Sequence, residues 1–492
     1  MTLEEEKETA DASAPRRARK KAAPSLYAEH QKVQPRSVSG TFRVLKWASN
    51  LTLVPLFILG PWLRWDRGPG VPDQAIFLDM AGRRGYFLSI EIWPQEVYYL
   101  TGLLLLGAIG LFLATALLGR VWCGFTCIQT VYTDIFQFIE AVIEGDRLQR
   151  LRLDKAPWTA GKLAKKAATN AVWLLVSLIV SVSWIFYFND APTTARALLD
   201  GSAPLGLYGF VGLFAASTFL FAGYAREQVC IYMCPWPRFQ ASMFDEDSLI
   251  VTYETWRGEP RGPAKAGQSF DGRGHCVDCT MCYQVCPTGI DIRDGSQLAC
   301  IGCGLCIDAC NGIMEKMGLP PGLITYDSTN NQLARSKGTP TRLRLVRSRT
   351  LIYGALLAAV AAVMAFGLWT RSTLEVNVLH ERSPLYVPMS DGSIRNGYTL
   401  KILNMGRAPQ VYVLRVQGIE GASLSVVGYG RDGATEVDLP VPGDSVGSFR
   451  VYVSAPRKGL KGKNHDLAFV LSEKTGGLSR THAALFAGPG GE

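Results

Sequence analysis

Histidine is scarce in this chain of 492 residues, and its few copies are scattered outside every long apolar run. The five are His30, His275, His380, His465 and His482. A b haem inside a membrane needs a pair of axial ligands such as two histidines within the apolar segments. The sequence therefore excludes a haem-bearing quinol oxidase subunit.

Nucleotide-binding motifs are missing as well. The stretch from Gly262 to Gly267 is followed by Gln268, where a Walker motif needs lysine, and no strand-embedded dinucleotide fingerprint is found. No nicotinamide or flavin site is therefore evident. Only 19% of the residues are charged, and the excess of 51 Lys+Arg over 42 Asp+Glu gathers beside apolar runs. That distribution argues against nucleic acid as a partner and favours a membrane topology signal.

Long apolar runs are abundant, since 48% of the residues are hydrophobic. Five runs of about 20 residues reach the length that crosses a bilayer as a helix. Membrane lipid is thus an expected partner, and the alternative of buried soluble helices is less favoured because length and charge pattern agree at each run. The five predicted spans are 43–63, 96–118, 168–188, 205–225 and 350–370.

The basic segments predict the orientation of these spans. Residues 1–42 form a flexible tail, and the tail, the 147–166 connection and the 335–349 connection are all rich in Lys and Arg. Alternation along the chain places all three on one face, which the positive-inside rule makes cytoplasmic. Residues 43–225 then form a four-span membrane domain. The segment 226–349 is too long and too rich in cysteine for a connector, so we expect a cytoplasmic domain there.

After the fifth span the pattern changes to alternating polar and apolar residues. Runs such as 410–416 and 448–453 are separated by Gly, Asn and Pro turn signals, as in an antiparallel β-sandwich. Residues 371–492 are therefore expected to form an all-β domain on the periplasmic side. This region contains no cysteine and no dense acidic or histidine cluster, which favours a role in contacts or positioning over catalysis.

The twelve cysteines fall into three groups, and eight of them form a doubled motif. Each half has the spacing Cys-x2-Cys-x2-Cys-x3-Cys of bacterial ferredoxins with two clusters, in which the fourth cysteine binds the other cluster. Pro287 follows the first half, whereas Asn311 follows the second. A structural zinc site is the weaker alternative because zinc needs a single set of four ligands. The predicted [4Fe–4S] ligands are Cys276, Cys279, Cys282 and Cys310 for one cluster, and Cys300, Cys303, Cys306 and Cys286 for the other.

The other four cysteines form two pairs with equal spacing, Cys123 with Cys127 and Cys230 with Cys234. The pairs follow the second and fourth predicted spans, so both lie at the cytoplasmic edge of the membrane. If the pairs lie on helical turns, their Cβ atoms are about 5–6 Å apart, which disfavours a disulfide. Paired thiolates suit a soft ion such as Cu(I). The alternative, that these are four small buried apolar side chains, stays open because free cysteine is often core.

Several motifs together resemble the cytochrome c oxidase accessory protein family of the CcoG/FixG/RdxA type. The resemblance runs from about residue 40 through the terminal sandwich, which corresponds to that family's Ig-like periplasmic domain. Ile128 follows Cys127 at the position where Pro235 follows Cys234. The motifs are Ile92-Trp-Pro-Gln95, Gly119-Arg-Val-Trp-Cys-Gly124, Gln129-Thr-Val131, Cys230-Ile-Tyr-Met-Cys-Pro-Trp236, Arg257-Gly-Glu-Pro-Arg261 and the doubled ferredoxin motif.

The family implies a bacterial inner-membrane cupric reductase, which reduces Cu(II) to Cu(I) for the assembly of cbb(3)-type cytochrome oxidase. The expected partners are then copper ions and oxidase subunits or copper chaperones, with an unidentified electron donor. A ferredoxin-type quinol dehydrogenase subunit that serves a periplasmic reductase is the alternative. A redox-sensing assembly scaffold is a third reading. The sequence leaves the oligomeric state open, a homodimer included.

Overall fold

The computed structural model describes residues 32–68, 70–460 and 462–489. The chain divides into two compact units, one up to Ala362 and one from Val363 onward. The first unit contains most of the helices and all twelve cysteines, and the second contains the β-sandwich. The predicted tail 1–42 lies largely outside the described residues.

Five helical segments are long and apolar enough to cross a membrane, which confirms the prediction of five such runs. The third is longer than expected because the helix begins at Ala160, where the Thr159 side chain accepts a hydrogen bond from the Lys162 backbone amide. The five segments are α1 with η2 (Thr41–Trp62), η3 with α2 (Pro94–Leu118), α5 (Ala160–Phe186), α7 with η5 (Leu205–Ala225) and α13 (Ser348–Trp369).

Shorter elements connect these helices. A three-stranded antiparallel sheet lies between α1 and α2, formed by β1 (Ile76–Asp79), β2 (Arg84–Phe87) and β3 (Ile90–Ile92). Further helices lie in the other connections of the first unit, and α3 packs along the end of α7. The connecting helices are α3 (Ile128–Ile143), α4 (Arg147–Lys155), α6 (Ala191–Leu199) and α8 (Trp236–Met243).

The cysteine-rich region forms a small ferredoxin-like domain. Its strands β4 (Ile250–Tyr253) and β5 (Ile324–Asp327) pair antiparallel beside α11 (Leu305–Lys316). Asn311 lies inside α11, and its side-chain oxygen accepts a hydrogen bond from the Gly322 amide. Because asparagine keeps the amide that proline lacks, α11 runs on past the second motif. The remaining elements are α9 (Thr255–Gly258), α10 (Met281–Gln284), η7 (Ile292–Asp294) and α12 (Thr329–Ser336).

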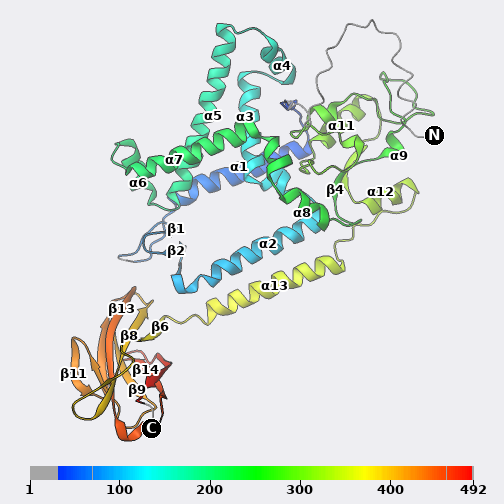
Figure 1. Ribbon diagram of the computed structural model, residues 1–492. Coiled ribbons are helices and arrows are strands. Elements are labelled where there is room, and N and C mark those ends of the chain that lie inside the picture. The colour runs from blue at the N-terminus through cyan, green and yellow to red at the C-terminus, as the bar shows by residue number, and fades with distance from the viewer. Residues whose placement is uncertain (1–31, 69, 461, 490–492) are drawn as a thin grey trace, which may run out of the picture. The chain divides into compact units, whose positions relative to one another are not determined.

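The ferredoxin-like domain contacts the first long helix directly, and Figure 1 shows α11 beside the start of α1. The backbone amides of Phe42 and Arg43 donate to the Asp308 carboxylate at 3.2 and 2.8 Å. A carboxylate at a helix N-terminus satisfies free amides and the helix dipole. At Gly40 a Cβ atom would lie 2.3 Å from the Asp308 Cγ atom, so this close approach requires glycine.

We expect Asp308→Ala to lower the free energy of unfolding by about 1 kcal/mol, since it leaves two helix N-terminal amides without their acceptor. The measurement is thermal or denaturant unfolding of the purified chain in detergent. Glu315→Ala is the matched control because Glu315 is exposed on the same helix. Equal stability of the two variants would show that the Asp308 contact contributes nothing.

The second unit is a sandwich of two antiparallel sheets, as the alternating pattern predicts. One sheet has the order β11-β10-β13-β8-β6, with β7 paired to β8, and the other has the order β12-β9-β14-β15. Inward-facing residues such as Leu400, Leu414, Val451 and Phe469 form its core. The strands are β6 (Leu374–His380), β7 (Val387–Pro388), β8 (Ser393–Asn404), β9 (Gln410–Gln417), β10 (Ser423–Val426), β11 (Tyr429–Ala434), β12 (Glu436–Val441), β13 (Ser445–Pro456), β14 (Asn464–Glu473) and β15 (Ser479–Ala487).

Candidate redox metal site

The first predicted ligand set surrounds one small cavity in the ferredoxin-like domain. Cys276, Cys279, Cys282 and Cys310 all line it, together with apolar residues such as Met314. The first two cysteines lie on the loop before α10, the third lies on α10 and the fourth on α11. The structure therefore brings together four cysteines from both halves of the doubled motif.

The second predicted set lines a neighbouring cavity. Cys286, Cys300, Cys303 and Cys306 surround it, and Cys282 also contacts it. The loops at the two cavities bend alike, because Asp278 and Thr280 in the first and Gly302 and Gly304 in the second all have left-handed φ angles between 52° and 71°. The equal bends turn successive cysteines of each loop toward the same side, although two of the four positions in question carry no glycine.

Each of the two cavities is lined by one of the two predicted sets of four cysteines, the number of protein ligands that a [4Fe–4S] cluster takes. Among the described residues, no group of three or more His, Cys, Asp or Glu side chains lies close enough to bind one metal ion. The cysteines instead lie around cavities in an apolar core, and burial raises the pKa of the Cys282 and Cys310 thiols to about 12. Cluster binding must therefore displace their protons.

The two pairs at the membrane edge share one backbone conformation. Gly119 (φ 59°, ψ −123°) and Arg226 (φ 35°, ψ −107°) end their helices alike. Four residues later in each case comes the first cysteine of a pair, inside a π-helical turn. The amides of Cys127 and Cys234 each donate at 2.8 Å to a carbonyl five residues back. The α-helical stacking that the spacing would allow is therefore not adopted.

The second cysteine of each pair is extended and precedes a new helix. Cys127 has φ −62° and ψ 127°, and Cys234 has φ −82° and ψ 120°. Ile128 in place of a proline thus leaves the first turn with the same shape as the second. The first turn leads into α3 and the second turn leads into α8.

The helices that follow the two turns pack reciprocally. α3, which follows the first turn, packs against η5 (Phe219–Ala225) at the end of α7, where the Gln129 side chain donates to the Phe221 carbonyl at 2.8 Å. α8, which follows the second turn, packs against α2, where the rings of Phe112 and Trp236 stack with centroids 5.8 Å apart. This exchange holds the two turns together, and Cys123 and Cys230 pack in one cluster.

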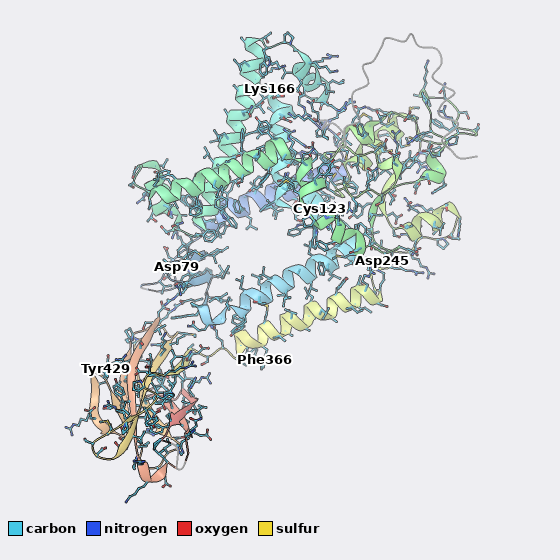
Figure 2. All side chains as sticks on the ribbon, in the orientation of Figure 1. Asp79, Cys123, Lys166, Asp245, Phe366 and Tyr429 are labelled. Carbon is cyan, nitrogen blue, oxygen red and sulfur yellow. The ribbon has the colours of Figure 1, made fainter. Side chains whose placement is uncertain are left out.

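That cluster also contains cysteines of the second cavity, Cys303 and Cys306. The contact is backbone to backbone, because a Cβ atom on Gly124 would lie 3.1 Å from the Cys303 Cα and N atoms. Arg120 secures it through one guanidinium nitrogen, which donates to the carbonyls of Gln297, Leu298 and Cys300 at 2.9, 2.6 and 2.6 Å. Figure 2 shows Cys123 where the long helices meet the ferredoxin-like domain.

The first thiol of each membrane-edge pair is largely buried, although all four cysteines keep some exposed surface. Burial, and then the like charges of neighbouring cysteines, raise the pKa of Cys123 and of Cys230 to about 12. The Cys123 sulfur lies 3.5 Å from the side-chain oxygen of Gln240, which is fully buried on α8. The amide nitrogen of Gln240 has no partner among the described residues. The Gln240 side chain can therefore hydrogen-bond the Cys123 sulfur both when it is protonated and when it is a thiolate.

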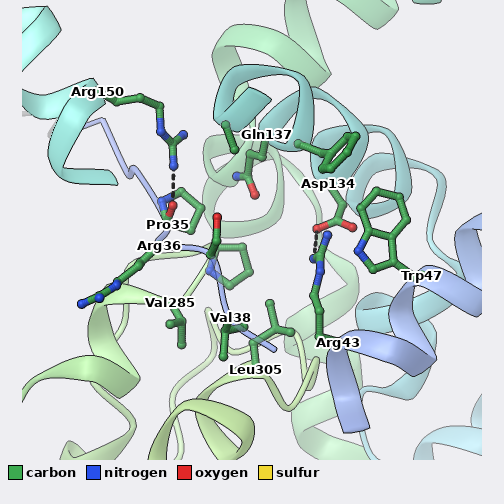
Figure 3. A pocket seen from close by; sticks show the side chains of 14 residues that line it. Pro35, Arg36, Val38, Arg43, Trp47, Asp134, Gln137, Arg150, Val285 and Leu305 are labelled. Atoms are coloured by element: carbon green, nitrogen blue, oxygen red, sulfur yellow. Dashed lines mark hydrogen bonds and ion pairs between the residues drawn. The ribbon is translucent and has the colours of Figure 1, made fainter. Parts of the chain in front are cut away.

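A cavity of about 220 Å³ lies where the ferredoxin-like domain meets α1 and α3. Figure 3 shows Arg43 paired with Asp134 on one wall and Arg150 bonded to the Pro35 carbonyl on another. Val285 and Leu305 close it from the ferredoxin-like side. The Arg43 and Asp134 side chains in its wall already pair with each other, so we assign this cavity to the junction between the ferredoxin-like domain and the helices.

Sequence reasoning missed the residues that join the membrane-edge cysteine turns to the ferredoxin-like domain. Gly124 follows Cys123 directly and Arg120 precedes it by three residues, so their proximity to the cysteine pair is a usable signal. Asp308 and Gln240 gave no signal because their partners are more than a hundred residues away in the chain. His275, which precedes Cys276, accepts a hydrogen bond from Arg257 at 3.0 Å.

Comparisons with protein families agree with this division of the chain. Residues 225–329 match a family described as a 4Fe-4S dicluster domain, and residues 100–142 match a 4Fe-4S binding domain. Residues 364–489 match a family described as the IG-like fold at the C-terminal of FixG. The iron–sulfur character predicted from the cysteine spacing is thereby confirmed at the level of the family.

Three characterised relatives align with nearly the whole chain. The nitrogen fixation protein FixG of Rhizobium meliloti is 45% identical over 88% of each chain. Protein RdxA of Cereibacter sphaeroides is 45% identical over 88% of this chain and 91% of its own, and protein RdxB of the same organism is 44% identical over 95% and 98%. A crystal structure of a FixG-related protein from Vibrio parahaemolyticus covers 24% of this chain and 98% of its own, with 21% identity and a TM-score of 0.21.

Proposed function

Because the chain belongs to the FixG and RdxA family of iron–sulfur electron-transfer oxidoreductases, we propose that it reduces Cu(II) to Cu(I) at the membrane edge. The Cu(I) serves the assembly of a cbb(3)-type cytochrome c oxidase. One observation carries the proposal, namely that the Cys300–Gly304 loop packs directly against Gly124 beside Cys123. An electron carrier held by that loop is next to a set of soft ligands.

Eight cysteines of the ferredoxin-like domain would hold the resident cofactors, four around each cavity. Two [4Fe–4S] clusters, when bound there, supply one-electron carriers. Cys276, Cys282 and Cys303 are each less than a tenth exposed, whereas Cys279 of the first set is exposed to solvent. The Arg120 contacts fix the second loop against the membrane-edge turn.

Copper is the substrate, and its proposed ligands are Cys123, Cys127, Cys230 and Cys234. Each turnover adds one electron to Cu(II) and yields Cu(I). Thiolates favour Cu(I) over Cu(II), so ligation raises the copper potential and assists the reduction. Because Cu(I) accepts few ligands, two of these four thiolates are enough to bind it at any one time.

The proposed setting is a bacterial inner membrane, with the ferredoxin-like domain on the cytoplasmic side and the sandwich in the periplasm. The basic connections between the spans support this orientation. The sandwich would then contact oxidase subunits or copper chaperones, since it lacks chemistry of its own.

We expect a Cys123→Ser, Cys127→Ser double variant to keep its iron–sulfur absorbance but to lose Cu(II) reduction, because serine is a poor ligand for Cu(I). The purified protein is reduced anaerobically, freed of reductant and given Cu(II), while a chromogenic chelator reports Cu(I). Thr126→Ser in the same turn is the control and should behave as wild type. If the double variant reduces Cu(II) at the wild-type rate, these cysteines are not the copper site.

A third iron–sulfur cluster at the four membrane-edge cysteines is the second candidate, in which case the site relays electrons. The 4Fe-4S binding family that matches residues 100–142 favours it, since Cys123 and Cys127 are the cysteines in that range. Iron analysis separates the two, because two clusters give about eight iron atoms per chain and three give about twelve. If the wild type contains about twelve iron atoms per chain and the double variant about eight, the four cysteines bind a third cluster and not copper.

A further inference from the structure

A cavity of about 250 Å³ lies within the membrane region, apart from both cysteine cavities. Its walls come from α1, α5, α7, η5 and the first turn of α3. An apolar cavity of about 150 Å³ is large enough to bind benzene, so this one can hold a six-membered ring with substituents. It lies among helices that are apolar enough to cross a membrane, which makes it accessible from the lipid.

The lining is aromatic and carries no charged side chain. Phe57, Trp184, Phe214 and Phe221 contribute ring faces or edges from three different helical segments. Tyr132 is only 7% exposed, and its hydroxyl makes no hydrogen bond with any of the described residues. A ligand that brings a hydrogen-bonding group into the cavity would give this hydroxyl a partner.

The cavity adjoins the proposed copper site through the chain itself. Ile128 and Gln129, which line the cavity, directly follow Cys127. The Gln129 side chain also donates to the carbonyls of Phe221 and Arg226, at the base of the second cysteine turn. The Gln129 side chain thus links the cavity wall to Arg226, which precedes the second cysteine turn.

These features select the chemistry of the ligand. The absence of charge in the lining excludes a nucleotide, whose phosphates need cationic or amide partners. A site reached from lipid needs an apolar ligand, and a site beside one-electron carriers needs a redox-active one. An aromatic diol with an apolar tail satisfies both requirements and offers a hydroxyl to Tyr132.

We propose that this cavity binds the ring of a membrane quinol, which is the electron donor for copper reduction. The proposal rests on the proposed function. The overall reaction balances as QH2 + 2 Cu(II) → Q + 2 H+ + 2 Cu(I), so that the quinol loses two electrons and two protons and each copper ion gains one electron. Two one-electron carriers match a donor that gives up two electrons.

The test uses the full chain in phospholipid nanodiscs with decylubiquinol as the probe. Ser217→Trp places an indole in the cavity, and Ala216→Trp is the matched control because Ala216 is exposed on the same helix and does not line the cavity. We expect decylubiquinol to drive Cu(I) formation in the wild type and in Ala216→Trp. In Ser217→Trp this activity is lost, while the same variant still reduces Cu(II) after it has been reduced with dithionite and freed of the reductant. Quinol-driven reduction that is absent in the wild type, or unchanged in Ser217→Trp, would overturn the proposal.

A binding readout keeps this test independent of copper chemistry. A photoreactive azidoquinone should label the peptides that contain Tyr132 and Phe221, and excess decylubiquinone should prevent the labelling. Labelling that decylubiquinone does not displace, as for a cavity filled by a lipid chain, would refute quinone binding. Failure of dithionite-reduced protein to reduce Cu(II) would instead refute the proposed function and leave the labelling result intact.

Discussion

A Glu140→Gln variant is expected to lose about 3–5 kcal/mol of unfolding free energy, because it leaves buried cations without their counter-charge. Glu140 is 1% exposed, and its carboxylate accepts from both terminal nitrogens of Arg226 at 2.6 and 3.0 Å and from Arg150 at 2.9 Å. Arg226 is itself 1% exposed and holds a left-handed φ of 35° at the base of the second cysteine turn. The loss should therefore disturb Cys230 as well as stability.

The measurement is thermal unfolding in detergent, followed by circular dichroism. Asp73→Asn is the control, since Asp73 is 64% exposed in its pair with Arg64 and an exposed pair contributes about 0–1 kcal/mol. If the two variants are equally stable, the buried ion pairs contribute no more than surface ones.

Acid should reproduce the effect in the wild type. Burial would raise the pKa of Glu140, but Arg226 and its other cationic neighbours lower it to about 2. A depressed pKa in the folded state means that this stabilisation is present above about pH 4.3, the ordinary value, and is lost as the pH falls toward 2. The stability difference between the wild type and Glu140→Gln should therefore shrink over that range. A difference that stays constant from pH 5 to pH 2 would contradict the assignment.

Gly124→Val is expected to slow copper reduction by about tenfold or more, because displacement of a reacting pair by about 1 Å can cost a hundredfold in rate. A Cβ atom at this position already meets the Cys303 backbone at 3.1 Å, and backbone cannot rotate away as a side chain can. The Cys300–Gly304 loop must then move off the first cysteine turn. Both sets of cluster ligands remain present.

Rates are followed by Cu(I) formation from protein that has been reduced with dithionite. Gly312→Val is the control in the ferredoxin-like domain, since a Cβ atom at Gly312 meets nothing within 4 Å. Unchanged copper reduction in Gly124→Val, with full cluster absorbance, would show that electrons do not pass through this contact.

The apolar spans and the cysteine sets could be predicted because their signals are local. A run of about 20 apolar residues fixes a helix of membrane length, and the x2-x2-x3 spacing fixes which cysteines a short loop can present together. The β-sandwich followed from alternation in segments such as Gln410–Gln417, which forms β9 as expected. In each case neighbouring residues carry the whole pattern.

The conformation of the membrane-edge turns could not be predicted in this way. A Cys-x3-Cys spacing suggests one α-helical turn, but Gly119 and Arg226 break their helices with positive φ angles and the chain resumes with a wider turn. Arg226 gives no warning, since arginine seldom adopts such an angle. The ion pair of Arg226 with Glu140, 86 residues earlier in the chain, offsets the strain of this backbone conformation.

Contacts between distant segments were likewise hidden. The link from Asp308 to the start of α1 spans 266 residues, and neither end carries a pattern that names the other. The Gln129 side chain lies in a recognisable motif, yet its contacts with the Phe221 and Arg226 carbonyls follow only from the packing of α3 on η5.

The two cysteine turns are built alike but face different surroundings. In the first turn Gly124 packs against the Cys300–Gly304 loop while Trp122 is 46% exposed, whereas Tyr232 and Met233 in the second are 73% and 59% exposed. Under the proposed function, electrons reach the copper site through the first turn, and copper ions enter beside the more exposed second turn. Copper ions can then be exchanged at the second turn without any movement of the loop that would hold the electron carrier.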